Sequence, residues 1–218
     1  MNSDVVIVDY GVGNLFSVFR AFEHCGANVE ISNNPAVILA APRLVLPGVG
    51  AFADGMNGLI ARGLDNIIIA YANTGKPLLG ICLGMQMLAT SSEEFGMHQG
   101  LDIISGRVRS ISRSSPEGKL YKVPYVGWAD LHYKDHETSW KGSILDGLVP
   151  GDAVYLTHTF AVTPSDSSQR LAYCIYNGEE VTSAIRKDNV YGVQFHPEKS
   201  GPVGLQIIKN FATLRKLA

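Results

Sequence analysis

The first hundred residues alternate between short apolar runs and segments whose apolar residues recur at helical spacing. Continuous apolar runs are typical of strands that are buried on both faces of a sheet. Leu15, Val18 and Phe22 indicate a helix after the first run, and a longer helical segment is expected over 52–73. The alternation predicts a parallel sheet covered by helices on both faces. The expected strands are 4–8, 29–31, 43–46 and 77–81.

From residue 102 onward the pattern changes to consecutive strand-like runs with turns between them. A final helix is expected from the spacing of Val203, Ile207, Phe211 and Leu214. We therefore predict an α/β fold with a parallel core and an antiparallel β insertion in the second half, all within one domain over 1–218. The strand-like runs are 103–111, 125–133, 152–160, 171–176, 181–186 and 190–195.

Composition narrows the class of protein. The 218 residues carry 18 Lys and Arg against 20 Asp and Glu, so the net charge of −2 gives little reason to expect nucleic acid or an anionic membrane as partner. With 46% hydrophobic and 17% charged residues, a packed globular protein is expected rather than a disordered chain. No apolar run approaches the ~18 residues of a membrane span, and no secretory signal is evident. Three cysteines without a CxxC pattern suit a cytoplasmic protein with reduced thiols.

Cys82 directly follows the strand expected at 77–81 and precedes a helical pattern, with Gly80 and Gly84 on either side. A nucleophile between two such glycines, at a strand-to-helix turn, is the nucleophile-elbow arrangement. The unpaired N–H groups at a helix start stabilise a thiolate. A lone cysteine is more often a buried structural residue. The two glycines at this junction favour a nucleophile instead.

A cysteine nucleophile needs a base, and His196 stands at the end of an apolar strand, where sites of α/β sheets gather. Pro197 favours an extended backbone at His196, so that His196 and Glu198 project to the same side. Glu198 could then orient the imidazole and complete a Cys–His–Glu triad. An ordinary surface His–Glu pair fits this short pattern equally well.

The segment 47–50 (PGVG) follows another expected strand. Its glycines allow the backbone to approach a ligand closely and to turn an N–H group into a cavity. Together with the N–H of Leu83, this segment could form an oxyanion hole. By itself it is only a glycine turn.

Two further patterns are incomplete versions of cofactor sites. Gly11 and Gly13 follow the first strand as in a dinucleotide-binding loop, but Phe16 stands where the third glycine is needed. His132 and His136 are four positions apart, but the segment reads as strand and loop, without the HExxH glutamate or a nearby cysteine. We therefore expect neither a nucleotide cofactor nor a metal.

Three of these segments, GICLGMQ, PGVG and GVQFHPEKS, resemble the signatures of class I, triad-type glutamine amidotransferases. More narrowly, residues 9–18, 47–56 and 196–205 resemble the family of glutaminase subunits of imidazole glycerol phosphate synthase, and the similarity runs along the whole chain. The resemblance implies a flavodoxin-like, mostly parallel sheet flanked by helices.

The resemblance also implies roles for individual residues. Cys82 would attack the side-chain amide of glutamine, and His196, oriented by Glu198, would protonate the leaving ammonia and later activate water. Backbone N–H groups of Val49, Gly50 and Leu83 would stabilise the oxyanion. The residues that would hold the substrate are Gln86, His158, Thr159 and Phe160.

The family works as a heterodimer with a (β/α)8-barrel cyclase. Ammonia passes through the barrel to a ribulosyl intermediate, which gives imidazole glycerol phosphate and aminoimidazole carboxamide ribotide in histidine biosynthesis. The resemblance implies that partner, glutamine as the substrate and no cofactor.

The chain departs from the family at 124–129, where Pro-Tyr-Val-Gly-Trp-Ala replaces the usual Pro-His-Met-Gly-Trp-Asn near the barrel interface. One alternative is therefore a related glutaminase subunit that supplies ammonia to a different synthase, such as one of surface-sugar synthesis. A glutamine-independent cysteine hydrolase is a second alternative, against which Gln86 and the PGVG segment argue. A non-catalytic binding partner is the third, and the presence of Cys82, His196 and Glu198 argues against it.

Overall fold

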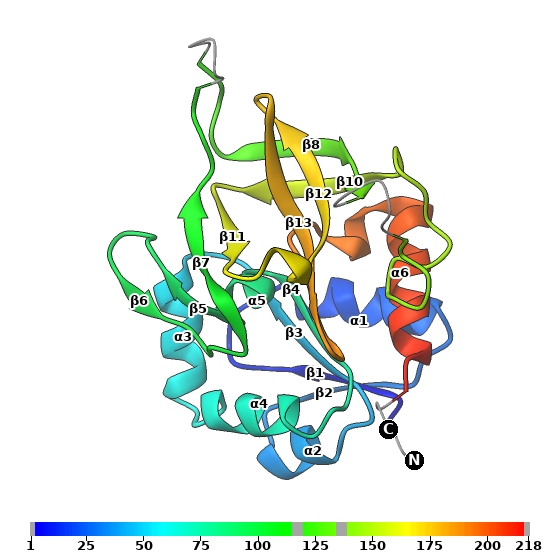
Figure 1. Cartoon of the computed structure of the whole chain (residues 1–218). Coiled ribbons are helices and arrows are strands. Elements are labelled where there is room, and N and C mark those ends of the chain that lie inside the picture. Colours follow the sequence, from blue (N-terminus) through cyan, green and yellow to red (C-terminus); the bar gives the residue numbers. More distant parts are fainter. Residues whose placement is uncertain (1–2, 115–119, 134–138, 216–218) are drawn as a thin grey trace.

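An eight-stranded mixed sheet forms the centre of the computed structural model, which describes residues 3–114, 120–133 and 139–215. The strand order is β2-β1-β3-β4-β14-β13-β12-β9 (Figure 1). The first five strands are parallel: β2 (Val29–Ser32), β1 (Val5–Val8), β3 (Leu44–Gly48), β4 (Leu78–Cys82) and β14 (Val190–Val193). The antiparallel strands are β13 (Glu179–Lys187), β12 (Arg170–Tyr176) and β9 (His132–Tyr133).

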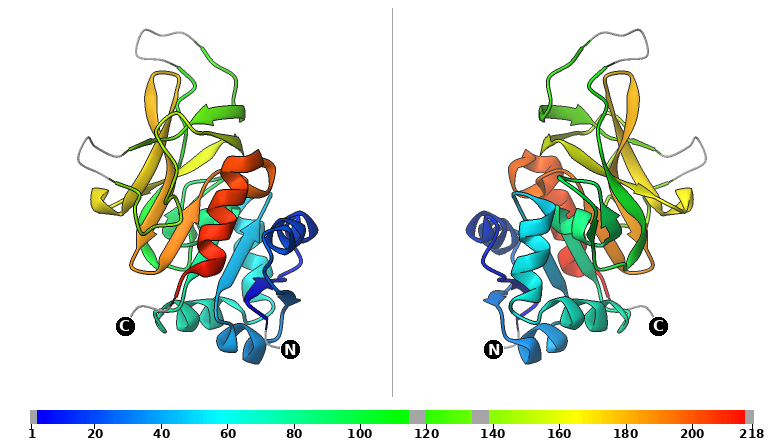
Figure 2. Two further views of the ribbon diagram at one scale, coloured as in Figure 1. Left: turned by 90° about the vertical axis from the view of Figure 1, so that its right-hand side faces the viewer. Right: turned by 90° about the vertical axis from the view of Figure 1, so that its left-hand side faces the viewer.

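Helices cover both faces of the parallel half, which explains why β1, β3, β4 and β14 are buried along their whole length. The α1 helix (Leu15–His24) and the α6 helix (Gly201–Thr213) share one face, where the rings of Phe22 and Phe211 meet edge to face. The two side views in Figure 2 show this layering. The opposite face carries α2 (Pro35–Ala40), α3 (Phe52–Ile60), α4 (Asp65–Ala72) and α5 (Leu83–Met87).

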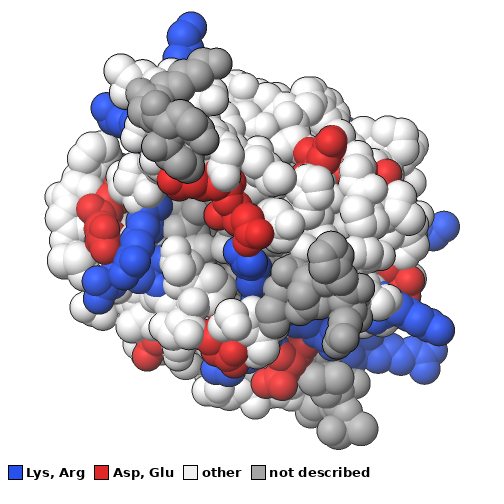
Figure 3. All heavy atoms as spheres, turned by 45° about the horizontal axis from the view of Figure 1, so that its top comes forward, with Lys and Arg blue, Asp and Glu red and all other residues white. Residues whose placement is uncertain are grey.

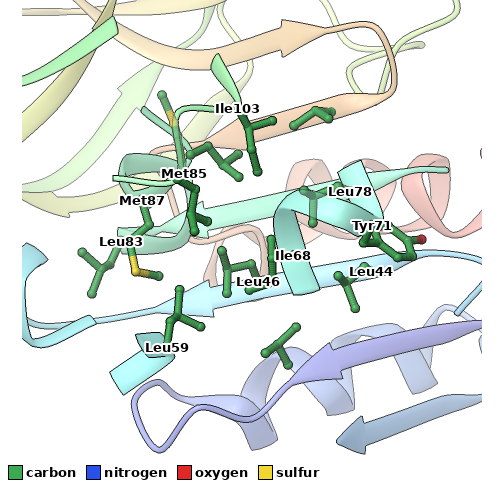
Figure 4. Close-up of a cluster of buried hydrophobic side chains, with 14 of the residues drawn as sticks. Leu44, Leu46, Leu59, Ile68, Tyr71, Leu78, Leu83, Met85, Met87 and Ile103 are labelled. Atoms are coloured by element: carbon green, nitrogen blue, oxygen red, sulfur yellow. The ribbon is translucent and has the colours of Figure 1, made fainter. Parts of the chain in front are cut away.

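Side chains from the sheet and from three helices interdigitate on that opposite face (Figure 4). Leu46 and Leu78 come from the strands, and they pack with Ile68 of α4 and Met85 of α5, all fully buried. Tyr71 lies in the same cluster, and its hydroxyl donates to the carbonyl of Pro77 (3.1 Å). This core fixes α5, the helix that follows the predicted nucleophile, against β3 and β4.

The second half adds two smaller β arrangements beside the main sheet, a mixed sheet in which β5 and β7 are parallel and an antiparallel ribbon. A four-stranded sheet has the order β11 (Phe160–Pro164), β7 (Ile104–Ser110), β5 (Ala89–Ser92) and β6 (His98–Gln99). A two-stranded ribbon pairs β10 (Ala153–His158) with β8 (Tyr125–Asp130). The described residues also include two short 3-10 helices, η1 (Ser167–Gln169) and η2 (Pro197–Lys199). The predicted fold class is confirmed, and the antiparallel strands β13, β12 and β9 continue the main sheet itself.

The helical segment expected over 52–73 is two helices, α3 and α4. The chain turns between them at Gly63, which adopts a φ of +64° that other residues rarely adopt. The helix α2 was not expected from the sequence, although Asn34 caps it and Pro35 occupies its first turn. Six residues are too few for a periodic pattern to appear, which explains the omission.

Candidate active site

Cys82 ends β4 with φ 54° and ψ −110°, a strained backbone conformation at the strand-to-helix turn. Gly80 and Gly84 must be glycines because a side chain at either position would collide with neighbouring backbone. A Cβ atom on Gly84 would lie 1.8 Å from the carbonyl oxygen of Leu46, and one on Gly80 would lie 2.7 Å from the backbone nitrogen of Met85. The predicted nucleophile elbow is therefore present, with α5 packed directly onto the parallel sheet.

His196 lies just beyond β14, the strand that pairs with β4. Its Nδ1 lies 2.9 Å from Oε1 of Glu198, and the two side chains are only 4% and 1% exposed. The Ser200 hydroxyl donates to the carbonyl of His196 (2.7 Å), and the backbone N–H of His196 donates to the carbonyl of Tyr155 (2.9 Å). Because this pair is buried and held on both sides, it is not an ordinary surface pair.

The electrostatic surroundings of His196 favour its charged form. Burial opposes a charge on the imidazole, but Cys82 and Glu198, through hydrogen bonding and charge, outweigh burial and raise the pKa of His196 to about 9. Its Nε2 has no partner in hydrogen-bonding geometry among the described residues, although Cys82 is close enough to affect the titration. At neutral pH the imidazolium therefore holds a proton on the side that Glu198 does not occupy.

A cavity of about 280 Å³ opens over the elbow. It brings together nine of the ten predicted site residues, and Glu198 lies behind His196. A larger cavity, of about 560 Å³, lies near the amino-terminal ends of β4 and β14 and contains none of them. The predicted residues that line the smaller cavity are Val49, Gly50, Cys82, Leu83, Gln86, His158, Thr159, Phe160 and His196.

The PGVG segment lies beside the nucleophile because Gly48 of β3 pairs in register with Cys82 of β4. A Cβ on Gly48 would lie 2.6 Å from the hydroxyl of Tyr10, which donates to the carbonyl of Pro47 (2.8 Å). Gly50 adopts a φ of +96°, a conformation that favours glycine. The loop thus lies beside Cys82, with Val49 and Gly50 on the wall of the same cavity.

His158 is buried against the cavity in its neutral form. Its pKa is lowered to about 4, mainly by burial and also by the nearby charge of His196, while the hydrogen bond with Phe160 acts in the opposite direction. Its Nδ1 donates to the carbonyl of Phe160 (3.0 Å), and its Nε2 has no partner among the described residues. His158 is therefore a neutral group, unlike His196.

Two further side chains that the sequence did not single out lie at this site. Glu94 lines the cavity, and its Oε2 accepts a hydrogen bond from the backbone N–H of Phe52 at the start of α3 (2.6 Å). Gln194 is fully buried, with its side-chain nitrogen 3.8 Å from the sulfur of Cys82. The adjacent pair Glu93 and Glu94 before a glycine turn carries no pattern that distinguishes a site residue. Gln194 belongs to the GVQFHPE segment, in which the sequence pattern indicated only His196 and Glu198 as site residues.

The incomplete cofactor patterns do not form sites in the part of the chain that is described. A Cβ on Gly11 would lie 2.5 Å from the guanidinium of Arg62, which packs against the loop at this glycine. His132 stacks on Tyr173 (5.4 Å between ring centroids), and His136 lies outside the described residues. Within the described ranges no group of three or more His, Cys, Asp or Glu side chains could hold a metal.

The surface above the site is mixed in charge and partly apolar. Figure 3 shows Lys and Arg intermixed with Asp and Glu around a broad uncharged area. Arg107 and Arg109 both lie near the carboxylate of Glu93 (3.6 and 3.5 Å), which offsets part of their charge. On β8, Val126 and Trp128 are 57% and 56% exposed and point to the same side.

In the described part of the chain no helix has the length and apolar character of a membrane span.

Comparison with known proteins agrees with this geometry. The family model described as glutamine amidotransferase class-I matches residues 6–214. The chain belongs to this family. The amidotransferase is 48% identical over 209 residues (96% of this chain and 98% of the relative) to imidazole glycerol phosphate synthase subunit HisH 1 of Legionella pneumophila strain Paris. It is 46% identical over 211 residues (96% and 100%) to subunit HisH of Syntrophotalea carbinolica.

Solved structures resemble the amidotransferase in fold at low sequence identity. A putative GMP synthase subunit from Thermoplasma acidophilum superposes with a TM-score of 0.67 at 20% identity, covering 95% of this chain and 91% of that one. The structure of PurLQS from Thermotoga maritima gives a TM-score of 0.69 at 18% identity, covering 97% and 98%. These two similarities support the fold alone.

Proposed function

We propose that this amidotransferase is the glutaminase subunit of an imidazole glycerol phosphate synthase. It hydrolyses glutamine to glutamate and ammonia, and it passes the ammonia to a partner that makes imidazole glycerol phosphate and aminoimidazole carboxamide ribotide in histidine biosynthesis. The observation that carries the proposal is that the elbow cysteine Cys82 shares one cavity with His196, whose imidazole is hydrogen-bonded to the buried Glu198. Its identity of 48% with a HisH subunit supports the choice of synthase.

The geometry supports a two-step hydrolysis. The sulfur of Cys82 attacks the side-chain carbonyl carbon of glutamine, and N–H groups of Leu83 and of the Val49–Gly50 segment stabilise the oxyanion. With a pKa of about 9, His196 is protonated at neutral pH and can give its proton to the leaving ammonia. The neutral imidazole then takes a proton from water, which attacks the thioester and releases glutamate.

The cavity also offers groups for the amino-acid end of glutamine. Glu94 is the one carboxylate among the residues found to line it, and a carboxylate is the natural partner of an α-ammonium group. The hydrogen bond from the Phe52 N–H fixes its position. Thr159 and Phe160 line the same cavity, and we assign them to the α-carboxylate through their backbone; Gln86 lines it as well.

A (β/α)8-barrel cyclase is the partner that we propose. Ammonia must leave the cavity without entering bulk water, so the partner should cover the cavity mouth. Val126 and Trp128 form an exposed apolar surface on β8, which pairs with the β10 residues Thr157 and His158 of the cavity wall. The free thiols of the chain suit a reducing cytoplasm, where we place the complex.

A second candidate is a glutaminase subunit that serves a different synthase. The feature that favours it is the changed segment at the proposed interface, where Tyr125 stacks on Tyr176 (3.9 Å between ring centroids) and Ala129 follows Trp128. The triad would work in the same way in both cases. Only the acceptor of ammonia would differ.

The test is to measure ammonia and glutamate from glutamine with the chain alone, and then with the cyclase subunit of the same organism and its ribulosyl ligand. We expect low activity alone and strong stimulation by the liganded partner, with one imidazole product per glutamine. Absence of stimulation from a chain whose Cys82 still reacts with a glutamine analogue would point to the second candidate. Absence of both reactions would contradict a glutaminase, and Cys82→Ala provides the background.

A further inference from the structure

A buried chain of hydrogen bonds runs from the wall of the cavity to the nucleophile. The Nε2 of Gln86 donates to the carbonyl of Phe160 (2.9 Å) and to Oε1 of Gln194 (3.1 Å). The Nε2 of Gln194 lies 3.8 Å from Sγ of Cys82, within the range for a hydrogen bond to sulfur. The Nδ1 of His158 donates to the same Phe160 carbonyl (3.0 Å).

The direction of every bond in this chain is set by the Phe160 carbonyl. A backbone carbonyl only accepts hydrogen bonds, so Gln86 must turn its NH2 group toward it. The second hydrogen of that NH2 group then points at Gln194, whose side-chain oxygen must accept it. The NH2 group of Gln194 is left facing the sulfur of Cys82, and it acts there as a donor.

The burial of Gln194 indicates that this arrangement has a purpose beyond packing. Its neighbours Val193 and Phe195 are apolar, and all three residues have no exposed surface. Burying an amide is unfavourable unless its polar atoms are bonded, so an apolar side chain would serve a packing role better. Both polar ends of the Gln194 amide instead contact groups of the site.

We propose that Gln194 is a positioning residue with two tasks. It donates a hydrogen bond to the sulfur of Cys82 from the core side, opposite the cavity, which favours the thiolate and holds it in place for attack. It also keeps the NH2 group of Gln86 engaged, so that the carbonyl oxygen of Gln86 is the atom left for the cavity. The second task rests on the proposed function, and the first concerns the thiol alone.

The first task is tested by the rate at which iodoacetamide alkylates Cys82, measured from about pH 5 to about pH 9 without glutamine or partner. Mass spectrometry of the Cys82 peptide separates this reaction from those of Cys25 and Cys174. Gln194→Met keeps the length of the side chain without a donor, and Gln194→Glu keeps its shape but turns an acceptor toward the sulfur. We expect both variants to be alkylated about tenfold more slowly near neutral pH, because the sulfur loses a hydrogen-bond donor.

Ser183→Ala is the matched control. Ser183 is fully buried on β13, and its carbonyl accepts the backbone N–H of Gln194. Its hydroxyl donates to the Val181 carbonyl, and within the described residues it makes no hydrogen bond with the sulfur of Cys82. Its alkylation profile should coincide with that of the parent. If the Gln194→Met profile also coincides with the parent profile, Gln194 only packs and the proposal is overturned. If Gln194→Met does not fold, as judged by circular dichroism, the Gln194→Glu profile decides in the same way.

The second task is tested by glutaminase kinetics in the complex with the partner. We expect Gln194→Met to raise KM for glutamine as well as to lower kcat, because Gln86 loses its orienting contact. An unchanged KM would overturn this task. A parent chain that releases no ammonia, but whose alkylation profile still depends on Gln194, would refute the proposed function and leave the first task standing.

Discussion

Acidification should destabilise this protein through His158. Burial lowers its pKa to about 4, with His196 adding to the shift and the Phe160 carbonyl opposing it, against an ordinary value of about 6.5. Between these two pH values the unfolded chain binds a proton at this position and the folded chain does not. The free energy of unfolding therefore falls as the pH drops from 6.5 toward 4, and it levels off below.

The magnitude follows from the two pKa values. Between about pH 7.5 and about pH 5, the His158 contribution amounts to a loss of about 2 kcal/mol. His196 acts in the opposite sense, because its folded pKa is raised to about 9. Its stabilisation is complete below pH 6.5 and is lost as the pH rises through 9. The pH dependence of the parent is thus a sum, and only a difference between variants isolates His158.

His158→Asn provides that difference, since an asparagine amide can still donate to the Phe160 carbonyl but does not titrate. Urea unfolding at about pH 7.5 and about pH 5 gives the free energy of unfolding for each protein. The parent should lose about 2 kcal/mol more than the variant between the two pH values. His24→Asn, an exposed site on α1, should behave as the parent does. Equal losses for the parent and His158→Asn would refute the reasoning.

Three further outcomes are expected. Cys82→Ala should abolish glutaminase activity with an unchanged circular dichroism spectrum, and ammonia release at the parent rate would end the proposed mechanism. Glu198→Gln should bring the pKa of His196 down from about 9, because burial is then less opposed, and an NMR titration of the imidazole that still gave 9 would contradict this. Gly84→Ala should cost about 3 kcal/mol or more in thermal unfolding, because its Cβ would meet the Leu46 carbonyl at 1.8 Å; unchanged stability would argue against the tight elbow.

The parts of the fold that the sequence predicted well are those in which a local pattern meets a uniform environment. The strands β1, β3 and β4 are buried on both faces, so an apolar run is enough to indicate them. The elbow was equally visible, because the two glycines beside Cys82 are required by steric contact with adjacent elements. Predictions of this kind need no knowledge of which strands pair.

The parts that were missed depend on contacts between distant segments. Glu94 becomes a site residue only because β5 pairs with β7 and brings the following turn to the start of α3. The bonds of Gln194 depend on Gln86 and Phe160, which come from other elements of the fold. Strands such as β6, two residues long, have too little pattern to be recognised. Tertiary structure decides these features, and one sequence does not display them.

The pairing of β4 with β14 has a consequence for the synthesis of the chain. Cys82 and Gln194, which lie at the ends of these central strands, are 112 positions apart. At ribosomal rates, β14 is therefore synthesised roughly 6–20 s after β4. During that interval a fully apolar strand is open on one side, which is a template for association with other nascent chains. The thiol of Cys82 also has neither His196 nor Gln194 beside it until β14 has emerged, so in the growing chain the proposed nucleophile still lacks its proposed base.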